Sequence, residues 1–169
     1  MLVSSSHAED QSCKCSLASE VLRRFGELRL QVTGASMLPS LWPGDLLSIR
    51  SARLPEVSRG DLVLFFRDNR FFVHRVLEVF THRLLTRGDG LATPDPPVGR
   101  DELLGRVVCI TRDGVTRPPS PLGAAGRLLA FGVGRSTTFC KVLLRLQPMC
   151  RRFLRPSTAL AVIPHAEEA

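Results

Sequence analysis

The residue best placed for chemistry is Ser36, which lies in the run Gly34-Ala35-Ser36-Met37-Leu38-Pro39-Ser40-Leu41-Trp42-Pro43-Gly44-Asp45. Pro39 disfavours helical geometry in the residue before it, and Pro43-Gly44-Asp45 predicts a turn into a strand over 46–49. The run therefore predicts a serine hydroxyl presented at the edge of a β-structure. Such a hydroxyl becomes a nucleophile when a neighbouring base takes its proton. A Ser/Pro/Gly loop that merely joins two strands explains the same residues.

Four further blocks follow the serine run, namely Arg59-Gly60-Asp61-Leu62-Val63-Leu64-Phe65-Phe66, Phe72-Val73-His74-Arg75-Val76-Leu77, Leu85-Thr86-Arg87-Gly88-Asp89 and Leu104-Gly105-Arg106-Val107-Val108. In this order and spacing the chain resembles the type I signal peptidases, which share a superfamily with the self-cleaving SOS and phage repressors. The resemblance covers residues 34–110, a little under half of the chain. It implies a coiled antiparallel β-domain and a serine endopeptidase that processes signal or leader peptides.

That family divides by its general base. Its usual bacterial members use a lysine, whereas its archaeal and endoplasmic-reticulum members place a histidine at the start of the equivalent strand. This chain has only Lys14 and Lys141, both outside the matched region, and the matching position holds His74. Histidine titrates near 6.5 and needs little adjustment to act as a base. The resemblance thus implies a Ser36–His74 pair, although a lone histidine in an alternating strand is more often a core residue.

A histidine base needs a group that fixes its tautomer and stabilises the imidazolium. In the histidine-type relatives an aspartate a few residues after a Gly-Asp block does this, and Asp95 matches it by spacing. Asp89 matches the Gly-Asp aspartate, which we interpret as shaping the loop around the site. Asp95 is therefore the favoured partner of His74. Asp89 remains the alternative, because the proline-rich run over 93–97 replaces the polar run usual in the family. Both aspartates also fit ordinary turn positions.

The oxyanion of the reaction needs hydrogen-bond donors, and the backbone N–H of Ser36 is the expected one. In lysine-type relatives a small hydroxyl residue two positions before the nucleophile adds a side-chain donor. This chain has Gly34 there and lacks that donor. Removing such a donor costs roughly 10²–10³ in rate in other enzymes. Met37 follows the nucleophile, and we interpret it as a packing residue at the floor of the site.

Length and composition fit one compact domain with tails. The chain has 169 residues, of which 44% are hydrophobic, an ordinary value for a globular protein. Its five cysteines show no secreted-domain spacing, and Cys13-Lys14-Cys15 lacks the second pair of a zinc site. The sequence therefore implies neither a metal nor a cofactor.

Three segments are predicted: a polar tail over 1–14, a peptidase domain over 15–113, and a basic, Pro-bounded C-terminal region over 114–169 that is helical in part. A helix is predicted over 16–28, ended by Gly26, with its apolar face formed by Leu17, Val21, Phe25 and Leu28. Strands are predicted over 28–33, 46–49, 62–66, 70–80, 83–86 and 104–111, with a hairpin turn at Asp68-Asn69-Arg70. The predicted fold class is mainly β and antiparallel.

The C-terminal region carries the excess charge of the protein. Residues 114–166 contain eight basic residues and no acidic ones. Apolar residues at helical spacing over 139–146 predict a basic amphipathic helix, so residues 122–155 suit peripheral contact with an anionic membrane or with an acidic partner. Packing of this helix on the β-domain explains the pattern equally well. Nucleic acid is not the expected partner, because no recognition motif accompanies the charge.

The segment before Ser36 predicts neither a membrane anchor nor a secretory signal. Residues 1–30 include eight charged groups, and no stretch there approaches the ~20 apolar residues of a membrane span. Membrane signal peptidases do carry such a span. The expected location is therefore cytoplasmic or peripheral to the membrane, with a peptide or preprotein as the substrate.

Two alternatives to a peptide-processing enzyme remain. A self-cleaving regulator would need an N-terminal DNA-binding domain, for which the 35 residues before the serine are too few. A non-enzymatic module could keep the fold and bind peptides or membrane surfaces. The joint presence of Ser36, His74 and Asp95 disfavours this module, because a site that had lost its catalytic activity would not need all three residues.

Overall fold

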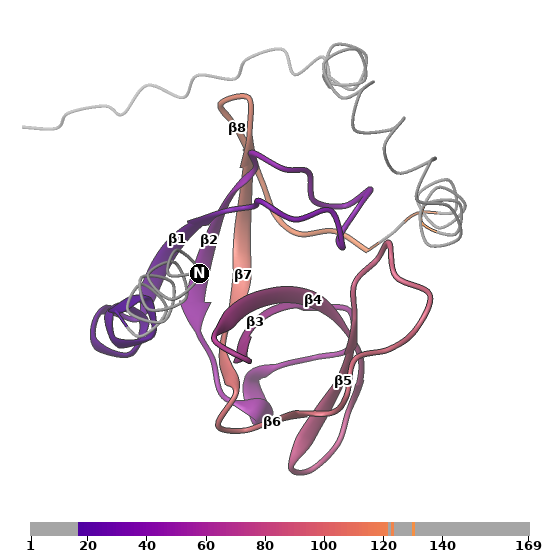
Figure 1. The fold of residues 1–169 in the computed structure, drawn as a ribbon. Helices are drawn as coiled ribbons and strands as arrows, with labels where there is room; N and C mark the ends of the chain where they lie inside the picture. The colour runs from indigo at the N-terminus through magenta and orange to yellow at the C-terminus, as the bar shows by residue number, and fades with distance from the viewer. Residues whose placement is uncertain (1–16, 122, 124–129, 131–169) are drawn as a thin grey trace, which may run out of the picture.

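The computed structural model describes residues 17–121 together with residues 123 and 130 (Figure 1). The polar tail predicted over 1–14 lies outside the described residues. So do the predicted helix start at Ser16 and, apart from those two positions, the basic region expected over 122–155.

One antiparallel sheet of eight strands forms the body of the protein, as Figure 1 shows. The strand order is β1-β2-β7-β3-β4-β5-β6, with β8 paired to β7. The strands are β1 (Glu27–Gln31), β2 (Leu46–Ser51), β3 (Leu62–Arg67), β4 (Arg70–Val79), β5 (Arg83–Arg87), β6 (Val98–Gly99), β7 (Leu103–Arg112) and β8 (Val115–Arg117), and a 3₁₀ turn, η1 (Leu54–Glu56), precedes β3. The predicted antiparallel, mainly β class is therefore confirmed.

Two tight turns define the hairpins of this sheet. Asp68 and Asn69 have φ of 50° and 58° between β3 and β4, and Asp113 and Gly114 have φ of 50° and 80° between β7 and β8. Two successive residues at positive φ match the right-handed twist of the flanking strands. The first turn was predicted from the sequence. The strands β6 and β8 were not, because runs of two or three residues carry no readable alternation.

Alternation along the central strands creates two apolar clusters on opposite faces of the sheet. In β3, Leu62 and Leu64 belong to the first cluster, whereas Val63 and Phe65 belong to the second. In β4, residues 71 and 73 pack against the first cluster, and residues 72 and 76 contact or belong to the second. The same alternation places the side chain of residue 74 on the second face.

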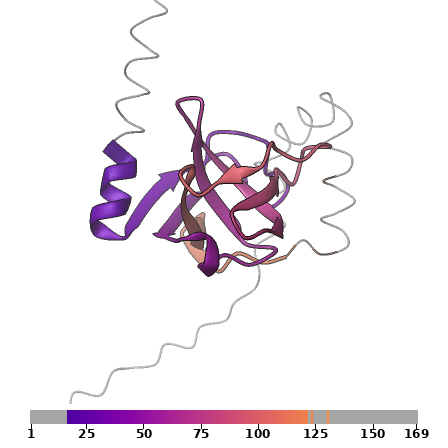
Figure 2. The same cartoon turned by 90° about the horizontal axis from the view of Figure 1, so that it is seen from below.

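The N-terminal helix differs from its prediction. Residues 17–25 are helical, and they lie beside the sheet in Figure 2. Leu22 is the buried residue at 1% exposure, while the predicted core positions Leu17 and Phe25 are 65% and 71% exposed. The helix ends at Gly26 as predicted: this residue has φ of 74° and its N–H donates to Leu22 O at 2.9 Å. Leu28 therefore belongs to β1 and not to the apolar face of the helix.

No helix among residues 17–121 is long and apolar enough to cross a membrane.

The first cluster should supply much of the folding free energy. Leu62 is 1% exposed within it, so we expect Leu62→Ala to lower the free energy of unfolding by about 2–5 kcal/mol. Leu17→Ala, on the exposed helix, should change it by less than about 0.5 kcal/mol. Urea denaturation measures both values, and equal losses would contradict this description of the core.

Candidate active site

His74 lies in the middle of β4 and is held by aromatic rings. It is opposite Val63 of β3 in the register and only 3% exposed. The rings of Phe65 and Phe72 lie 5.8 and 5.9 Å from the imidazole, between ring centroids. Packing on these two rings restricts the orientation of the imidazole. Its two nitrogens are thereby directed at fixed positions.

Ser36 lies in a turn that follows β1. The N–H of Leu38 donates to Ala35 O at 3.1 Å, and the N–H of Leu41 donates to Met37 O at 3.0 Å. Met37 and Leu41 are buried in the first apolar cluster. The apolar side chains of the turn therefore anchor it in the core, while Ser36 itself stays partly exposed.

The far end of this turn is fastened by a buried carboxylate. Asp45 is fully buried and its Oδ2 accepts the N–H of Trp42 at 2.8 Å. Arg112, the last residue of β7, binds both oxygens of Asp45 at 2.7 and 2.6 Å. The same guanidinium donates to Ser40 O at 3.2 Å. The serine turn is thereby tied to β7.

The loop after β5 closes against the serine turn. Gly90 N–H donates to Ser36 O at 2.8 Å. A Cβ built on Gly88 would lie 2.6 Å from the same oxygen, a distance that real Cβ atoms do not adopt. Glycine at position 88 is therefore required for the close approach of the two loops.

These elements bring Ser36, His74 and Asp95 into one hydrogen-bonded chain. The hydroxyl of Ser36 lies 3.1 Å from His74 Nε2. On the other side of the ring, Nδ1 lies 2.7 Å from Asp95 Oδ2. Both distances are within hydrogen-bond range for a nucleophile, its base and the group that orients the base. With Asp95 on Nδ1, the neutral ring has Nε2 free to accept the serine proton.

Asp95 is held in place by Thr86 of β5. The Thr86 hydroxyl donates to Asp95 Oδ2 at 2.7 Å, and the N–H of Asp95 donates to Thr86 O at 2.8 Å. Thr86 is fully buried. The carboxylate is thus fixed through both its side chain and its backbone.

Asp89 has different partners from Asp95. Arg75, the residue after His74, binds both Asp89 oxygens at 2.8 Å, and the Ser40 hydroxyl donates to Asp89 Oδ2 at 2.5 Å. Arg75 also donates to Gly60 O at 2.9 Å. The structure therefore places Asp89 in a buried ion pair beside the site and places Asp95 on the histidine.

The loop that carries Asp95 is bound by Arg67, the last residue of β3. Its guanidinium donates to Pro96 O at 3.0 Å and to Pro97 O at 2.9 Å. It also forms a two-point ion pair with Glu102, at 2.5 and 2.7 Å. Hydrogen bonds from Arg67 are the main reason that the pKa of Glu102 is lowered, and those to Glu102 raise the pKa of Arg67.

An apolar pocket of about 590 Å³ opens beside Ser36. This volume lies within the range of small-ligand pockets. Its apolar lining includes Leu30, Met37, Leu41, Leu64, Phe71 and Val73. The polar lining residues are Gln31, Thr33, Ser36, Asn69 and Arg70. A side chain of a bound molecule could therefore reach apolar surface while its backbone lies at the serine.

Gly34 also lines this pocket. A Cβ built at that position would meet nothing within 4 Å. Position 34 thus faces open space. Room for a side chain at position 34 exists, although glycine supplies none.

Sequence reasoning did not identify Thr86, Arg75, Ser40 or Arg67 as parts of this site. Thr86 and Arg75 stand inside the quoted blocks, so their polarity on strands with buried neighbours was a readable signal. Arg67 and Glu102 are 35 residues apart in the chain, and no local pattern relates them.

Neither a scan of protein-family models nor a search of curated proteins finds a match for this chain.

Breaking the ion pair between Arg75 and Asp89 should destabilise the protein strongly. The side chains of Arg75 and Asp89 are only 11% and 5% exposed, so Asp89→Ala leaves a buried guanidinium without its carboxylate. We expect a loss of about 3–5 kcal/mol in the free energy of unfolding. The matched control Glu27→Ala breaks the exposed pair with Arg50 and should cost no more than about 1 kcal/mol. Similar losses in urea denaturation would refute the difference.

The pair between Glu102 and Arg67 should stabilise the protein only when Glu102 is ionised. Because folding lowers the pKa of Glu102 from 4.5, its contribution is complete above that unfolded value and disappears as the pH falls through the folded one. Near neutral pH the free energy of unfolding of the wild type should exceed that of Glu102→Gln by about 1 kcal/mol. This difference should disappear in strong acid. Urea denaturation across this range tests the prediction, and a gap that is independent of pH would contradict it.

Proposed function

We propose that this protein is a serine endopeptidase that resembles the histidine-type signal peptidases. The observation that carries the proposal is the chain from Ser36 Oγ to His74 Nε2, at 3.1 Å, and from His74 Nδ1 to Asp95, at 2.7 Å. An apolar pocket adjoins the serine and offers room for a side chain of a bound peptide. The antiparallel, strongly coiled sheet is compatible with the β-domain of that family, and we include the signal-peptidase fold type in the proposal.

In the proposed reaction, Ser36 Oγ attacks the carbonyl carbon of the scissile peptide while His74 Nε2 takes the hydroxyl proton. Asp95 stabilises the imidazolium that forms. The imidazolium then gives its proton to the leaving amine, and the C–N bond breaks to leave an acyl-enzyme. In the second half, His74 takes a proton from water as the water oxygen attacks the ester carbonyl. The imidazolium then returns that proton to Ser36 Oγ as the C–O bond breaks, which releases the carboxylic acid and restores the serine. No redox step or cofactor enters this balance.

An extended peptide fits the open sheet edges around the pocket. β1 is an edge strand of the sheet. The N–H of Val32 donates to Asp45 O and the N–H of Gly44 donates to Val32 O, both at 2.8 Å, in the segment just before β2. The backbone groups of Gln31 and Thr33 therefore point away from that segment. Both residues line the pocket. A substrate that adds as a strand there would bring its carbonyl to Ser36.

The other wall of the pocket has a similar opening. β5 pairs with β4 only from Arg75 onward, so within the described residues the 71–73 segment of β4 has no strand on that side. Phe71, Phe72 and Val73 line the pocket. We therefore propose that the peptide lies between the end of β1 and the start of β4. Trimming of a signal or leader peptide is the use that the family resemblance suggests.

The test is covalent labelling of the purified protein with an alkyl fluorophosphonate between about pH 5 and 9. We expect Ser36→Ala to abolish labelling. His74→Ala and Asp95→Asn should each slow it by roughly 10²–10⁴-fold. The wild-type rate should rise with pH, because only the neutral form of His74 can take the serine proton.

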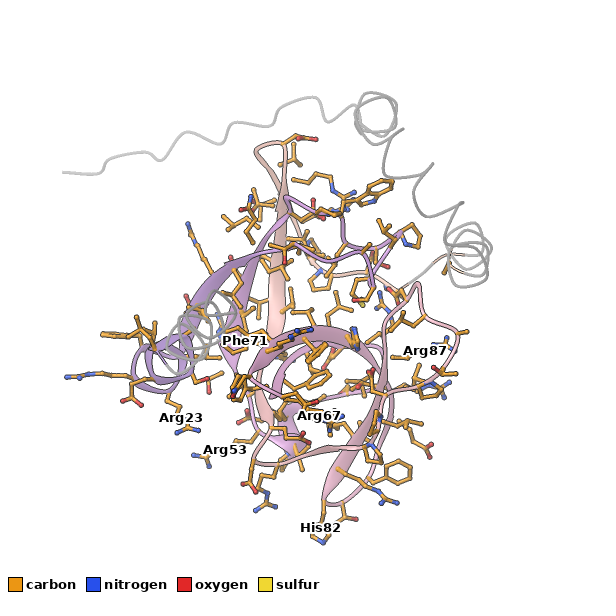
Figure 3. All side chains as sticks on the ribbon, viewed as in Figure 1. Arg23, Arg53, Arg67, Phe71, His82 and Arg87 are labelled. Atoms are coloured by element: carbon orange, nitrogen blue, oxygen red, sulfur yellow. The ribbon has the colours of Figure 1, made fainter. Side chains whose placement is uncertain are left out.

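Matched controls separate chemistry from general disturbance. Ser58→Ala and Asp101→Asn change exposed residues. His82→Ala changes a histidine at the tip of the β4–β5 hairpin, and Figure 3 shows it far from Phe71, which lines the pocket. All three should label at the wild-type rate. Labelling that persists in both Ser36→Ala and His74→Ala, or no labelling of the folded wild type, would reject the peptidase in favour of a binding module.

A further inference from the structure

We propose that Arg67 is a positioning residue of the site: it fastens the loop of Asp95 so that this carboxylate stays on His74. The inference rests on the proposed function, in which the His74–Asp95 contact matters for the reaction. Arg67 touches neither Ser36 nor His74 through a hydrogen bond in the described contacts, so its effect is transmitted through the loop.

The composition of the loop explains why it needs an outside donor. The run Thr93-Pro94-Asp95-Pro96-Pro97 contains three prolines, and proline has no N–H. Such a loop cannot satisfy its own carbonyls through local turns to the usual extent. The two carbonyls directly after Asp95 accept instead from Arg67, at 3.0 and 2.9 Å. A single guanidinium thereby fixes the peptide on the C-terminal side of Asp95.

Glu102 holds Arg67 from the opposite side. The ion pair uses two N–H groups and both carboxylate oxygens, a geometry that restricts the guanidinium plane. Glu102 Oε2 also accepts the N–H of Gly99 at 2.8 Å, and Gly99 belongs to β6. The loop is therefore held at Pro96, at Pro97 and at β6 by one pair of charges.

The same arginine also belongs to the aromatic packing under the histidine. Its guanidinium carbon lies 5.6 Å from the ring centroid of Phe65. Phe65 stacks on Phe72 at 5.4 Å, and both rings contact His74. Arg67 is therefore linked to both ends of the His74–Asp95 hydrogen bond, by packing to the imidazole and by hydrogen bonds to the loop of the carboxylate.

Arg67 can act through its charge or by positioning the loop, and these two roles predict opposite effects on the protonation of His74. The charge of Asp95 adds to that of Glu102 in raising the pKa of Arg67, so the cation also interacts with the catalytic carboxylate through space. If only charge mattered, removing the cation would favour protonated His74. If positioning dominates, loss of Arg67 lets Asp95 move off the ring, and protonated His74 loses its partner.

The experiment compares Arg67→Gln, Arg67→Lys and Glu102→Gln by labelling rate and by NMR titration of [¹³C]histidine, with His74 assigned through His74→Ala. Positioning predicts that Arg67→Gln slows labelling roughly 10- to 100-fold. It also predicts that the His74 titration midpoint moves to lower pH, in the direction of Asp95→Asn. Arg67→Lys should restore only part of the rate, because lysine cannot hold two carbonyls and a carboxylate in one plane. Glu102→Gln should give a smaller change in the same direction.

Arg50→Gln is the matched control, since it breaks an exposed arginine–glutamate pair away from the site; it should change neither readout. A midpoint that rises in Arg67→Gln, full recovery with lysine, or no change in either readout would overturn the proposal. If the folded wild type is not labelled at all, the proposed function fails. The NMR titration then still tests whether Arg67 keeps Asp95 on His74.

Discussion

Each loop of the candidate site is anchored to the sheet by a two-point ion pair between an arginine of a strand and a carboxylate. Arg112 holds Asp45 at the end of the serine turn, and Arg75 holds Asp89 beside it. Arg67 and Glu102 do the same for the loop of Asp95. Planar, two-point geometry restrains direction as well as distance. Three irregular segments can therefore meet with hydrogen-bond accuracy.

The net contribution of these ion pairs to stability is small, although removing one partner of a buried pair is costly. Burying charges is costly, and their mutual attraction repays that cost only when the geometry is good and the remaining polar atoms are satisfied. Asp45 and Asp89 each have a further donor, from Trp42 and Ser40 respectively. The sheet supplies the stability through its two apolar clusters. The ion pairs then fix the positions of the loops relative to the sheet.

His74 connects the apolar core of the sheet with the loops that the ion pairs hold. Its place in β4 puts it on the face of the second cluster, against Phe65 and Phe72, so the core itself orients the ring. Ser36 reaches it from the turn after β1, and Asp95 reaches it from the loop after β5. The core thus fixes the orientation of the histidine ring, and two loops place Ser36 and Asp95 beside it. Such an arrangement is suited to preorganised proton transfer.

The sequence by itself determined six of the eight strands to within about two residues at each end, the turn between β3 and β4, and the residue types of a Ser–His–Asp chain. These features are local: alternation, turn chemistry and motif spacing can be read within a few residues. Only the tertiary structure decided that Asp95 lies on His74, that Asp89 pairs with Arg75, that Leu22 is the buried helix residue, and that Arg67 with Glu102 holds the proline loop. Each of these depends on which segments pack together across the coiled sheet. Contacts of that kind are fixed by burial and geometry over dozens of residues, and no local pattern encodes them.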